Sequence, residues 1–314
     1  MAKKEEKLQE KNSALAKFNR IHPVTNVIFS LVFIFAALCC VIPLIFVIII
    51  SFTSDSSIRL NGYSFFPSEW SIKAYTAVFQ NARAVLLAAW NSIFITIVGT
   101  VIGLVLNATM GYVLSRNSFK FKKLYTIFIF IPMVFNGGMV SSYMIVTQVL
   151  HLQDTVWAVI LPLCVSSFYV IILRTFFTTT VPDSLIESGK IDGASQLRIF
   201  FQIVLPISLP ALATIGLFLA FAYWNDWFNA MLYNATTQDA WPLQYMLISI
   251  EKNLEFLANN PAFSGMNAQE MLKNLPQDGV RMALVVITVI PIACTYPFFQ
   301  RYFVSGLTIG AVKG

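Results

Sequence analysis

The stretch VPDSLIESGKIDGASQLRIFFQIVLPISLP occupies residues 181–210 and lies between two long apolar runs of the chain. It contains acidic and basic side chains, several serines and a central Asp-Gly pair, whereas the flanking runs are nearly free of charge. Ionisable side chains avoid the hydrocarbon core of a bilayer unless they have a function there. The stretch is therefore expected to connect two membrane-spanning segments at the membrane surface.

The first half of this stretch predicts a short helix. Pro182 favours a turn, and the side chain of Asp183 or Ser184 can cap a helix that runs over 185–191. The Asp-Gly pair at 192–193 should end this helix, because glycine adopts positive φ without steric cost.

The second half predicts another short helix over 194–202, after which 203–210 should enter the membrane. Two short helices at an angle form a rigid element that can transmit a push, which a flexible loop cannot do. An ordinary helix in an interfacial loop is the alternative, and the residues by themselves do not separate the two interpretations.

Composition identifies the whole chain as an integral membrane protein. Of its 314 residues, 57% are hydrophobic and only 11% are charged, against about 25% charged in a soluble domain. The mean hydropathy is +0.71. The four cysteines all lie within apolar runs and form no C-x-x-C pair, which is typical of small buried apolar side chains. The first apolar run is too long for a signal peptide and is expected to be an uncleaved span.

Six apolar runs are long enough to cross about 30 Å of hydrocarbon as helices. Their non-alternating, aromatic-rich content favours helices over barrel strands. The sequence therefore predicts an all-α membrane protein with six transmembrane helices. The expected spans are 27–52, 85–114, 124–146, 156–177, 204–223 and 282–303.

The distribution of basic residues predicts the orientation. Fifteen of the 21 Lys and Arg residues fall in the two tails and in the second and fourth connections, and six fall on the other side. The positive-inside rule then places both termini and the 181–210 stretch in the cytoplasm. This bias accounts for the net charge of +6 without nucleic acid.

The expected organisation follows from these spans. It comprises a cytoplasmic tail over 1–26, a six-helix transmembrane domain over 27–304 and a cytoplasmic tail over 305–314, with a long outer loop over 224–281. The first tail can form an interfacial helix or remain disordered. A polar loop as long as the outer one is usually functional or disordered.

Several kinds of chemistry have no residues to support them. The only Gly-Lys pair, at 189–190, lacks the rest of a P-loop, and the two histidines, His22 and His151, flank different spans on opposite sides of the membrane. No catalytic, metal or cofactor site is expected, so the chain is not expected to be an enzyme. The spans hold no central ionisable residue before Asp226, which argues against an ion-coupled carrier. A transporter of this kind needs an energy-supplying partner.

The segment ESGKIDGASQLRIFFQIVLP resembles the cytoplasmic EAA loop of ABC-importer permeases, which docks into a groove of the ATPase subunit. Ser188 and Gly189 stand where that family often has alanines, and glycine there lowers helix propensity by up to about 1 kcal/mol. The resemblance implies that the 181–206 loop, between the fourth and fifth spans, couples the permease to the ATPase. The coupling residues would be Glu187, Ser188, Gly189, Asp192, Gly193, Ala194, Leu205 and Pro206.

The segments WNDWFNAMLY (224–233) and FFQRYFVSGLTIGAVKG (298–314) resemble carbohydrate permeases related to the smaller membrane subunit of maltose transporters. This resemblance implies a bacterial plasma-membrane permease for a carbohydrate, with an oligosaccharide as the expected solute. Its partners would be a second homologous permease, two copies of an ATPase and an external or periplasmic solute-binding protein. A permease for a peptide or phosphate, and a membrane assembly protein that transports nothing, are the alternatives.

A few polar and aromatic residues are candidates for the solute pathway. Asn107 continues a stripe of small residues with Gly99 and Gly103, which favours helix packing at least as much as a pathway. Aromatic side chains near the outer end of the fifth span can stack on sugar rings or form an interfacial belt. Acidic and amide side chains there can bind hydroxyls or anchor the loop. The candidates are Asn107, Asn136, Trp224, Asp226, Trp227 and Asn229.

Overall fold

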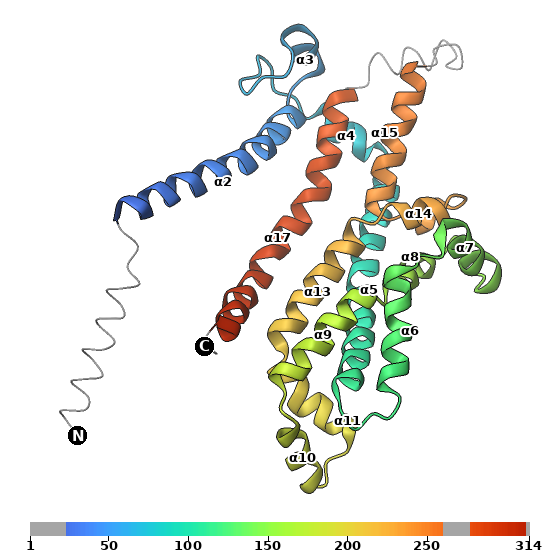
Figure 1. Ribbon diagram of the computed structural model, residues 1–314. Helices are drawn as coiled ribbons and strands as arrows, with labels where there is room; N and C mark the ends of the chain where they lie inside the picture. The colour runs from blue at the N-terminus through green and yellow to red at the C-terminus, as the bar shows by residue number, and fades with distance from the viewer. Residues whose placement is uncertain (1–22, 260–276, 312–314) are drawn as a thin grey trace.

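The computed structural model describes residues 23–259 and 277–311 and shows a bundle of helices (Figure 1). The described residues contain no strand, only an isolated bridge between Thr53 and Trp70. The predicted all-α class is confirmed. The expectations for most of the N-terminal tail, the middle of the outer loop and the last three residues lie outside the described residues.

Three helices are long and apolar enough to span a membrane alone. They are α2 (Pro23–Ser51), α5 (Ala82–Ser115) and α17 (Gln277–Ala311), and they confirm the first, second and sixth expected spans. Helix α5 has 34 residues, which corresponds to about 51 Å. Because the hydrocarbon core is about 30 Å thick, the ends of α5 reach the polar regions on both sides.

The other three expected spans are bent pairs of helices. Helix α6 (Lys122–Val134) is followed at 116° by α7 (Gly138–Met144), which continues as the π-helical η2 (Ile145–Val149). Helix α8 (Val156–Leu163) is followed at 46° by α9 (Ser167–Thr180), and the helical segment 196–207 is followed at 84° by α13 (Leu209–Trp224). The bundle has six spans when each bent pair counts as one.

The third span differs most from the expectation of one straight helix over 124–146, because α6 ends at Val134. Asn136 causes the turn. Its side-chain Oδ1 accepts a hydrogen bond from the backbone N–H of Gly138 at 2.9 Å, and Gly138 has a φ of +86°. The bend at this glycine is sharp enough to lead α7 away from the axis of α6 (Figure 1).

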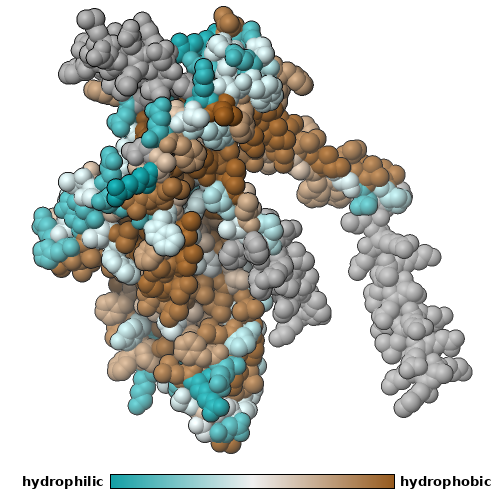
Figure 2. All heavy atoms as spheres, turned by 180° about the vertical axis from the view of Figure 1, so that it is seen from behind, coloured by the Kyte–Doolittle hydropathy of each residue, from teal (hydrophilic) through white to brown (hydrophobic). Residues whose placement is uncertain are grey.

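Helix α5 lies at the centre of the bundle and packs against α9 and α13 along much of its length. Helix α17 packs against α13 and α2, and α2 extends away from the bundle as a separate arm (Figure 1). Figure 2 shows apolar side chains over the middle of the molecule and along this arm, with polar side chains gathered towards both ends. This pattern is that of a membrane-embedded body with two wetted ends.

Short helices build the two ends of the bundle. One end carries α10 and α11, whereas α3 and the distal part of α15 lie at the opposite end (Figure 1). The short elements and the outer-loop helices are α3 (Asp55–Asn61), α4 (Lys73–Val78), η1 (Phe79–Asn81), α10 (Asp183–Ile191), α11 (Gln196–Ile199), η3 (Phe200–Val204), α12 (Leu205–Ile207), α14 (Phe228–Tyr233), η4 (Gln238–Ala240) and α15 (Leu243–Asn259).

Candidate functional site

The 182–208 connection, which joins α9 to α13, contains the two helical limbs that the sequence predicts. The first limb is α10, and its predicted cap is wrong. Pro182 occupies the N-cap position and no side chain caps the helix, because Asp183 is already the first helical residue. The Asp183 carboxylate instead accepts hydrogen bonds from Arg116 at 3.0 Å and Asn117 at 3.3 Å.

The second limb is longer than expected. It begins at α11, where the side chain of Ser195 accepts a hydrogen bond from the N–H of Arg198, and it continues through η3 and α12 to Ile207. Helix α13, the second helix of the bent fifth span, therefore begins at Leu209, whereas one continuous helix was expected from 204. The limb ends and the chain turns near Ser208 because the prolines at 206 and 210 cannot donate helical hydrogen bonds on either side of it.

Gly193 ends the first limb in a Schellman motif. The N–H of Ala194 donates to the carbonyl of Gly189 at 2.9 Å, and the N–H of Gly193 donates to that of Lys190 at 3.0 Å. Gly193 has a φ of +78°, which disfavours a residue with a Cβ. The predicted glycine break is confirmed, and it sets the angle between the two limbs.

The remaining predicted coupling residues divide into exposed and packed positions. Glu187 and Ser188 are exposed on α10, Asp192 is exposed at its C-cap, and Pro206 is exposed on the other limb. Gly189 is buried between the limbs, where a Cβ would lie 3.2 Å from Cγ1 of Ile199. The glycine that lowers helix propensity thus allows the limbs to approach closely.

The tip of the connection combines charge with apolar surface. Ile191 is 86% exposed and Leu197 is 70% exposed, and they accompany the exposed carboxylates of Glu187 and Asp192. Exposed large apolar side chains gathered on a rigid surface are typical of an interaction site. The shape and chemistry of this tip therefore suit contact with another protein.

Asn107 supports the break between α8 and α9. Its Nδ2 donates to the carbonyls of Gly103 at 2.6 Å and Cys164 at 2.8 Å, and its Oδ1 accepts from the N–H of Ser166 at 3.0 Å. The side chain is completely buried. Backbone groups at a helix break inside a membrane need such partners, so this geometry favours the packing interpretation of Asn107.

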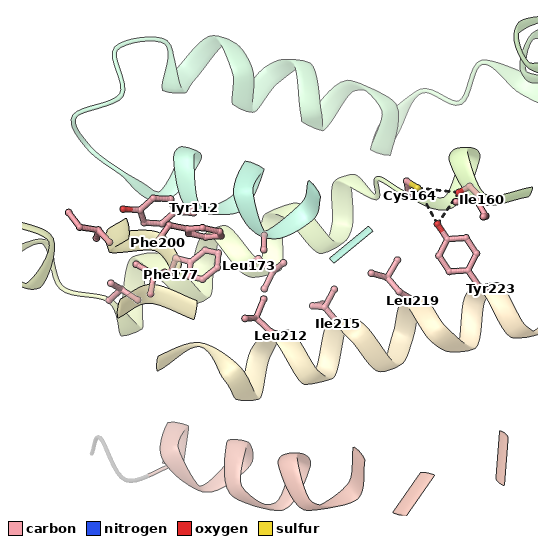
Figure 3. Packing of buried hydrophobic residues seen from close by; sticks show 14 of the residues in the cluster. Tyr112, Ile160, Cys164, Leu173, Phe177, Phe200, Leu212, Ile215, Leu219 and Tyr223 are labelled. Atoms are coloured by element: carbon pink, nitrogen blue, oxygen red, sulfur yellow. Dashed lines mark hydrogen bonds between the residues drawn. The ribbon is translucent and has the colours of Figure 1, made fainter. Parts of the chain in front are cut away.

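Tyr223 supports the same break from α13. Its hydroxyl donates to the carbonyl of Ile160 at 2.9 Å and lies 3.4 Å from Sγ of Cys164 (Figure 3). The ring packs on α5 at Gly99, which is why the small-residue stripe of α5 is needed. The broken fourth span is therefore held between α5 and α13 by a buried polar network.

We expect replacement of Asn107 by leucine to destabilise the protein by about 2–5 kcal/mol, because the Cys164 carbonyl and the Ser166 N–H would each lose a buried partner. The thermal unfolding midpoint of the purified protein in detergent measures this effect. Thr109→Val is the matched control on α5, because the Thr109 hydroxyl bonds only to carbonyls of its own helix. An Asn107→Leu protein as stable as the control would contradict the supporting role.

Trp224 lines a cavity of about 490 Å³ between α5, α13 and α17. Its indole N–H donates to the carbonyl of Thr288 at 3.1 Å. Thr96 and Thr100 also line this cavity, and their hydroxyl oxygens are buried without a hydrogen-bond partner among the described residues. The cavity therefore brings one predicted pathway residue of α13 together with two threonines of α5.

Asp226 and Asn229 lie together just beyond α13. The Asp226 carboxylate accepts hydrogen bonds from the backbone N–H of Asn229 at 3.2 Å and from its side-chain Nδ2 at 3.0 Å. Burial raises the pKa of the Asp226 carboxyl, and the hydrogen bonds from Asn229 act against this rise. This pairing favours the loop-anchoring interpretation of both residues.

The last two candidates lie apart from the cavity lining. The Trp227 ring packs edge-on against Phe228, and Nζ of Lys252 lies 5.7 Å from the Trp227 ring centroid. Asn136 is exposed and forms the α6–α7 turn. The predicted pathway residues thus occupy several separate places in this conformation.

Comparison with known proteins identifies the chain. Residues 99–309 match the family model described as "Binding-protein-dependent transport system inner membrane component". Protein LplC of Bacillus subtilis (strain 168) is 37% identical over 274 residues, which cover 87% of this chain and 90% of LplC. The polygalacturonan/rhamnogalacturonan transport system permease protein YtcP of the same strain is 36% identical over 278 residues, which cover 88% of this chain and 94% of YtcP.

A solved structure has the same fold. A chain in the crystal structure of a bacterial ABC transporter involved in the import of the acidic polysaccharide alginate superimposes with a TM-score of 0.77 and 26% sequence identity, covering 89% of this chain and 96% of that chain. The predicted resemblance to importer permeases is confirmed. With its matched residues spanning most of the bundle, the chain belongs to the family of binding-protein-dependent transport system inner membrane components.

Proposed function

We propose that this chain is one permease subunit of an ABC importer that carries an oligosaccharide across the bacterial plasma membrane. The observation that carries the proposal is the 36% identity to YtcP over 88% of the chain, since the name of that relative specifies transport of polygalacturonan and rhamnogalacturonan. The likeness to a chain of an alginate importer supports the same class of solute. Both relatives favour a carbohydrate over a peptide.

The 182–208 connection is proposed as the element that docks on a cytoplasmic ATPase. Its support is the rigid pair of limbs, the exposed carboxylate of Glu187 and the apolar side chains at the tip. The positive-inside bias of the sequence supports a cytoplasmic position for this end and for both termini. ATP-driven closure of two ATPase copies would then move the connection and switch the permease between outward and inward access.

A second, homologous permease subunit is proposed as the partner in the membrane. The α2 arm supports this idea, because only 6% of the residues in the most apolar part of this helix are buried within the chain. The outer elements, including the long helix α15, are proposed to meet a solute-binding protein. The cavity beside Trp224 is the proposed place for the solute pathway of this half, because this aromatic candidate lines it together with Thr96 and Thr100 of α5.

An uptake assay tests the proposal. The chain is reconstituted in liposomes with its second permease and ATPase, and the solute-binding protein is added with a panel of labelled solutes. We expect ATP-dependent uptake of one or more oligosaccharides, uronic-acid oligomers included, and no uptake of peptides. Peptide uptake without glycan uptake would contradict the carbohydrate class, and ATP-independent uptake would contradict the importer mechanism.

A further inference from the structure

Arg116 is a buried cation at the end of α5. It is 8% exposed, although it directly follows the last residue of a 34-residue apolar helix. A buried guanidinium group is tolerated only when its N–H groups have partners. Nε of Arg116 donates to Oγ of the adjacent Ser115 at 2.9 Å, and its two Nη atoms find partners in two other elements, an arrangement that was not visible in the sequence.

The first set of partners is the C-terminal end of α9. Nη2 of Arg116 donates to the carbonyl of Phe177 at 3.0 Å, and both Nη atoms lie 3.4 Å from the carbonyl of Val181. The last carbonyls of a helix lack intrahelical donors, and Pro182, which follows, has no N–H group. Arg116 therefore satisfies the end of the fourth span and compensates the negative end of its dipole.

The second partner is the start of the 182–208 connection. Nη1 of Arg116 donates to Oδ1 of Asp183 at 3.0 Å, and Asn117 donates to the other carboxylate oxygen at 3.3 Å. Asp183 is the first residue of α10, where a negative charge is favourable. Charges of alternating sign thus follow one another here. They are the partial negative charge at the end of α9, the positive charge of Arg116, the negative charge of Asp183 and the partial positive charge at the start of α10.

Tyr112 lies one turn before Arg116 on α5 and contacts the other limb of the connection. Cζ of Arg116 lies 5.4 Å from the Tyr112 ring centroid. The ring packs against Phe200 at 5.1 Å and against Phe177 at 6.1 Å between centroids (Figure 3). The end of α5 therefore contacts both limbs of the connection. Arg116 binds the start of the first limb, and Tyr112 packs against the second limb.

We propose that Arg116 is a positioning residue that locks α10 to the ends of α5 and α9, so that movement of the connection is transmitted to the second and fourth spans. The inference rests on the proposed coupling function of the connection. Arg116 itself touches neither nucleotide nor solute in this role. Its guanidinium suits the task because it presents five N–H donors in a rigid, planar fork, whereas a lysine has three donors on one nitrogen.

The test compares Arg116→Gln, Arg116→Lys, Asp183→Asn and the Arg116→Gln/Asp183→Asn double variant in the complete complex in liposomes. Basal ATP hydrolysis, hydrolysis stimulated by loaded binding protein, and sugar imported per ATP are measured. Lys120→Gln is the matched control, because it removes an exposed positive charge four residues away, without touching the cluster. The thermal unfolding midpoint of each complex is recorded alongside.

We expect Arg116→Gln to keep basal hydrolysis and to lower sugar imported per ATP by roughly tenfold, since losing one charged hydrogen bond changes an equilibrium by about that factor. Arg116→Lys should lie between Arg116→Gln and wild type. Asp183→Asn should lower the sugar imported per ATP less than Arg116→Gln does. In the double variant this ratio should fall by less than the two single effects combined. The Lys120→Gln control should behave as wild type.

Two outcomes separate this inference from the proposed function. If wild type couples hydrolysis to uptake, and folded Arg116→Gln complexes import as much sugar per ATP as wild type, Arg116 is a structural residue only and the inference is overturned. If wild type itself shows no ATP-dependent uptake, the proposed function is wrong.

Discussion

Replacing Gly99 with leucine should prevent assembly of the helix bundle. An added Cβ at Gly99 would lie 2.5 Å from Cζ of Tyr223 and 2.7 Å from two further ring atoms. The Tyr223 ring has little freedom to move, because it is 1% exposed and its hydroxyl is bonded to the Ile160 carbonyl. Even Gly99→Ala should cost about 1–3 kcal/mol as an overpacked contact.

The larger leucine must force α5 and α13 apart, which also removes Tyr223 from the α8–α9 break. We therefore expect less than about a tenth of the wild-type amount of folded protein, since each 1.4 kcal/mol changes a folding equilibrium tenfold. Detergent extraction followed by size-exclusion chromatography measures the folded fraction. The matched control is Val101→Leu, at a side chain of the same helix that is 58% exposed.

A compensating change makes this prediction sharper. The double variant Gly99→Leu/Tyr223→Ala exchanges a large ring for a leucine at the same contact, so it should recover part of the folded protein that Gly99→Leu loses. A Gly99→Leu protein that folds as well as Val101→Leu would show that the close approach of α5 and α13 is not required.

Replacing Gly193 with valine should leave the protein folded but stop transport. No atom lies within 4 Å of an added Cβ at Gly193, so the substitution causes no collision. Its cost arises from the φ of +78°, which penalises a residue with a Cβ by about 1–2 kcal/mol and a β-branched one more. That strain falls on the Schellman motif that sets the angle between the two limbs of the 182–208 connection.

The expected result is near-normal abundance in the membrane, a steep fall in uptake, and ATP hydrolysis that no longer responds to the loaded binding protein. Glu187→Lys should act in the same direction, because it puts a positive charge on the exposed surface of α10. Gly193→Asn is the matched control, since asparagine adopts positive φ more readily than other non-glycine residues. Full sugar-stimulated hydrolysis by Gly193→Val and Glu187→Lys would exclude the connection as the coupling element.

Features that depend on local sequence were predictable. Six apolar runs indicated the membrane-spanning segments, because transfer into hydrocarbon depends mainly on composition and length. The break at Gly193 and the bend near Gly138 were also predictable, since glycine at these positions has a local conformational reason to be there. The match to importer permeases followed from the same local segment around Gly193.

Features that depend on how an apolar run meets its neighbours were not predictable in detail. A straight helix and a bent pair have the same hydropathy, so the run over 124–146 read as one span although its two helices meet at 116°. The sequence similarly predicts that the second limb ends near 202. In the structure, Phe200 packs against Tyr112 and a π-helical turn over 200–204 follows, so that the limb continues to Ile207.

By itself, the sequence determined the all-α membrane class, the number of spans counted as runs, and the family, because these depend on composition and on contiguous motifs. Only the tertiary structure decided the roles of Asn107 and Arg116. Asn107 binds a carbonyl 57 residues away, and Arg116 binds one 61 residues away. A polar side chain in an apolar helix shows in the sequence that it needs partners, but which distant backbone groups supply them depends on how the helices pack.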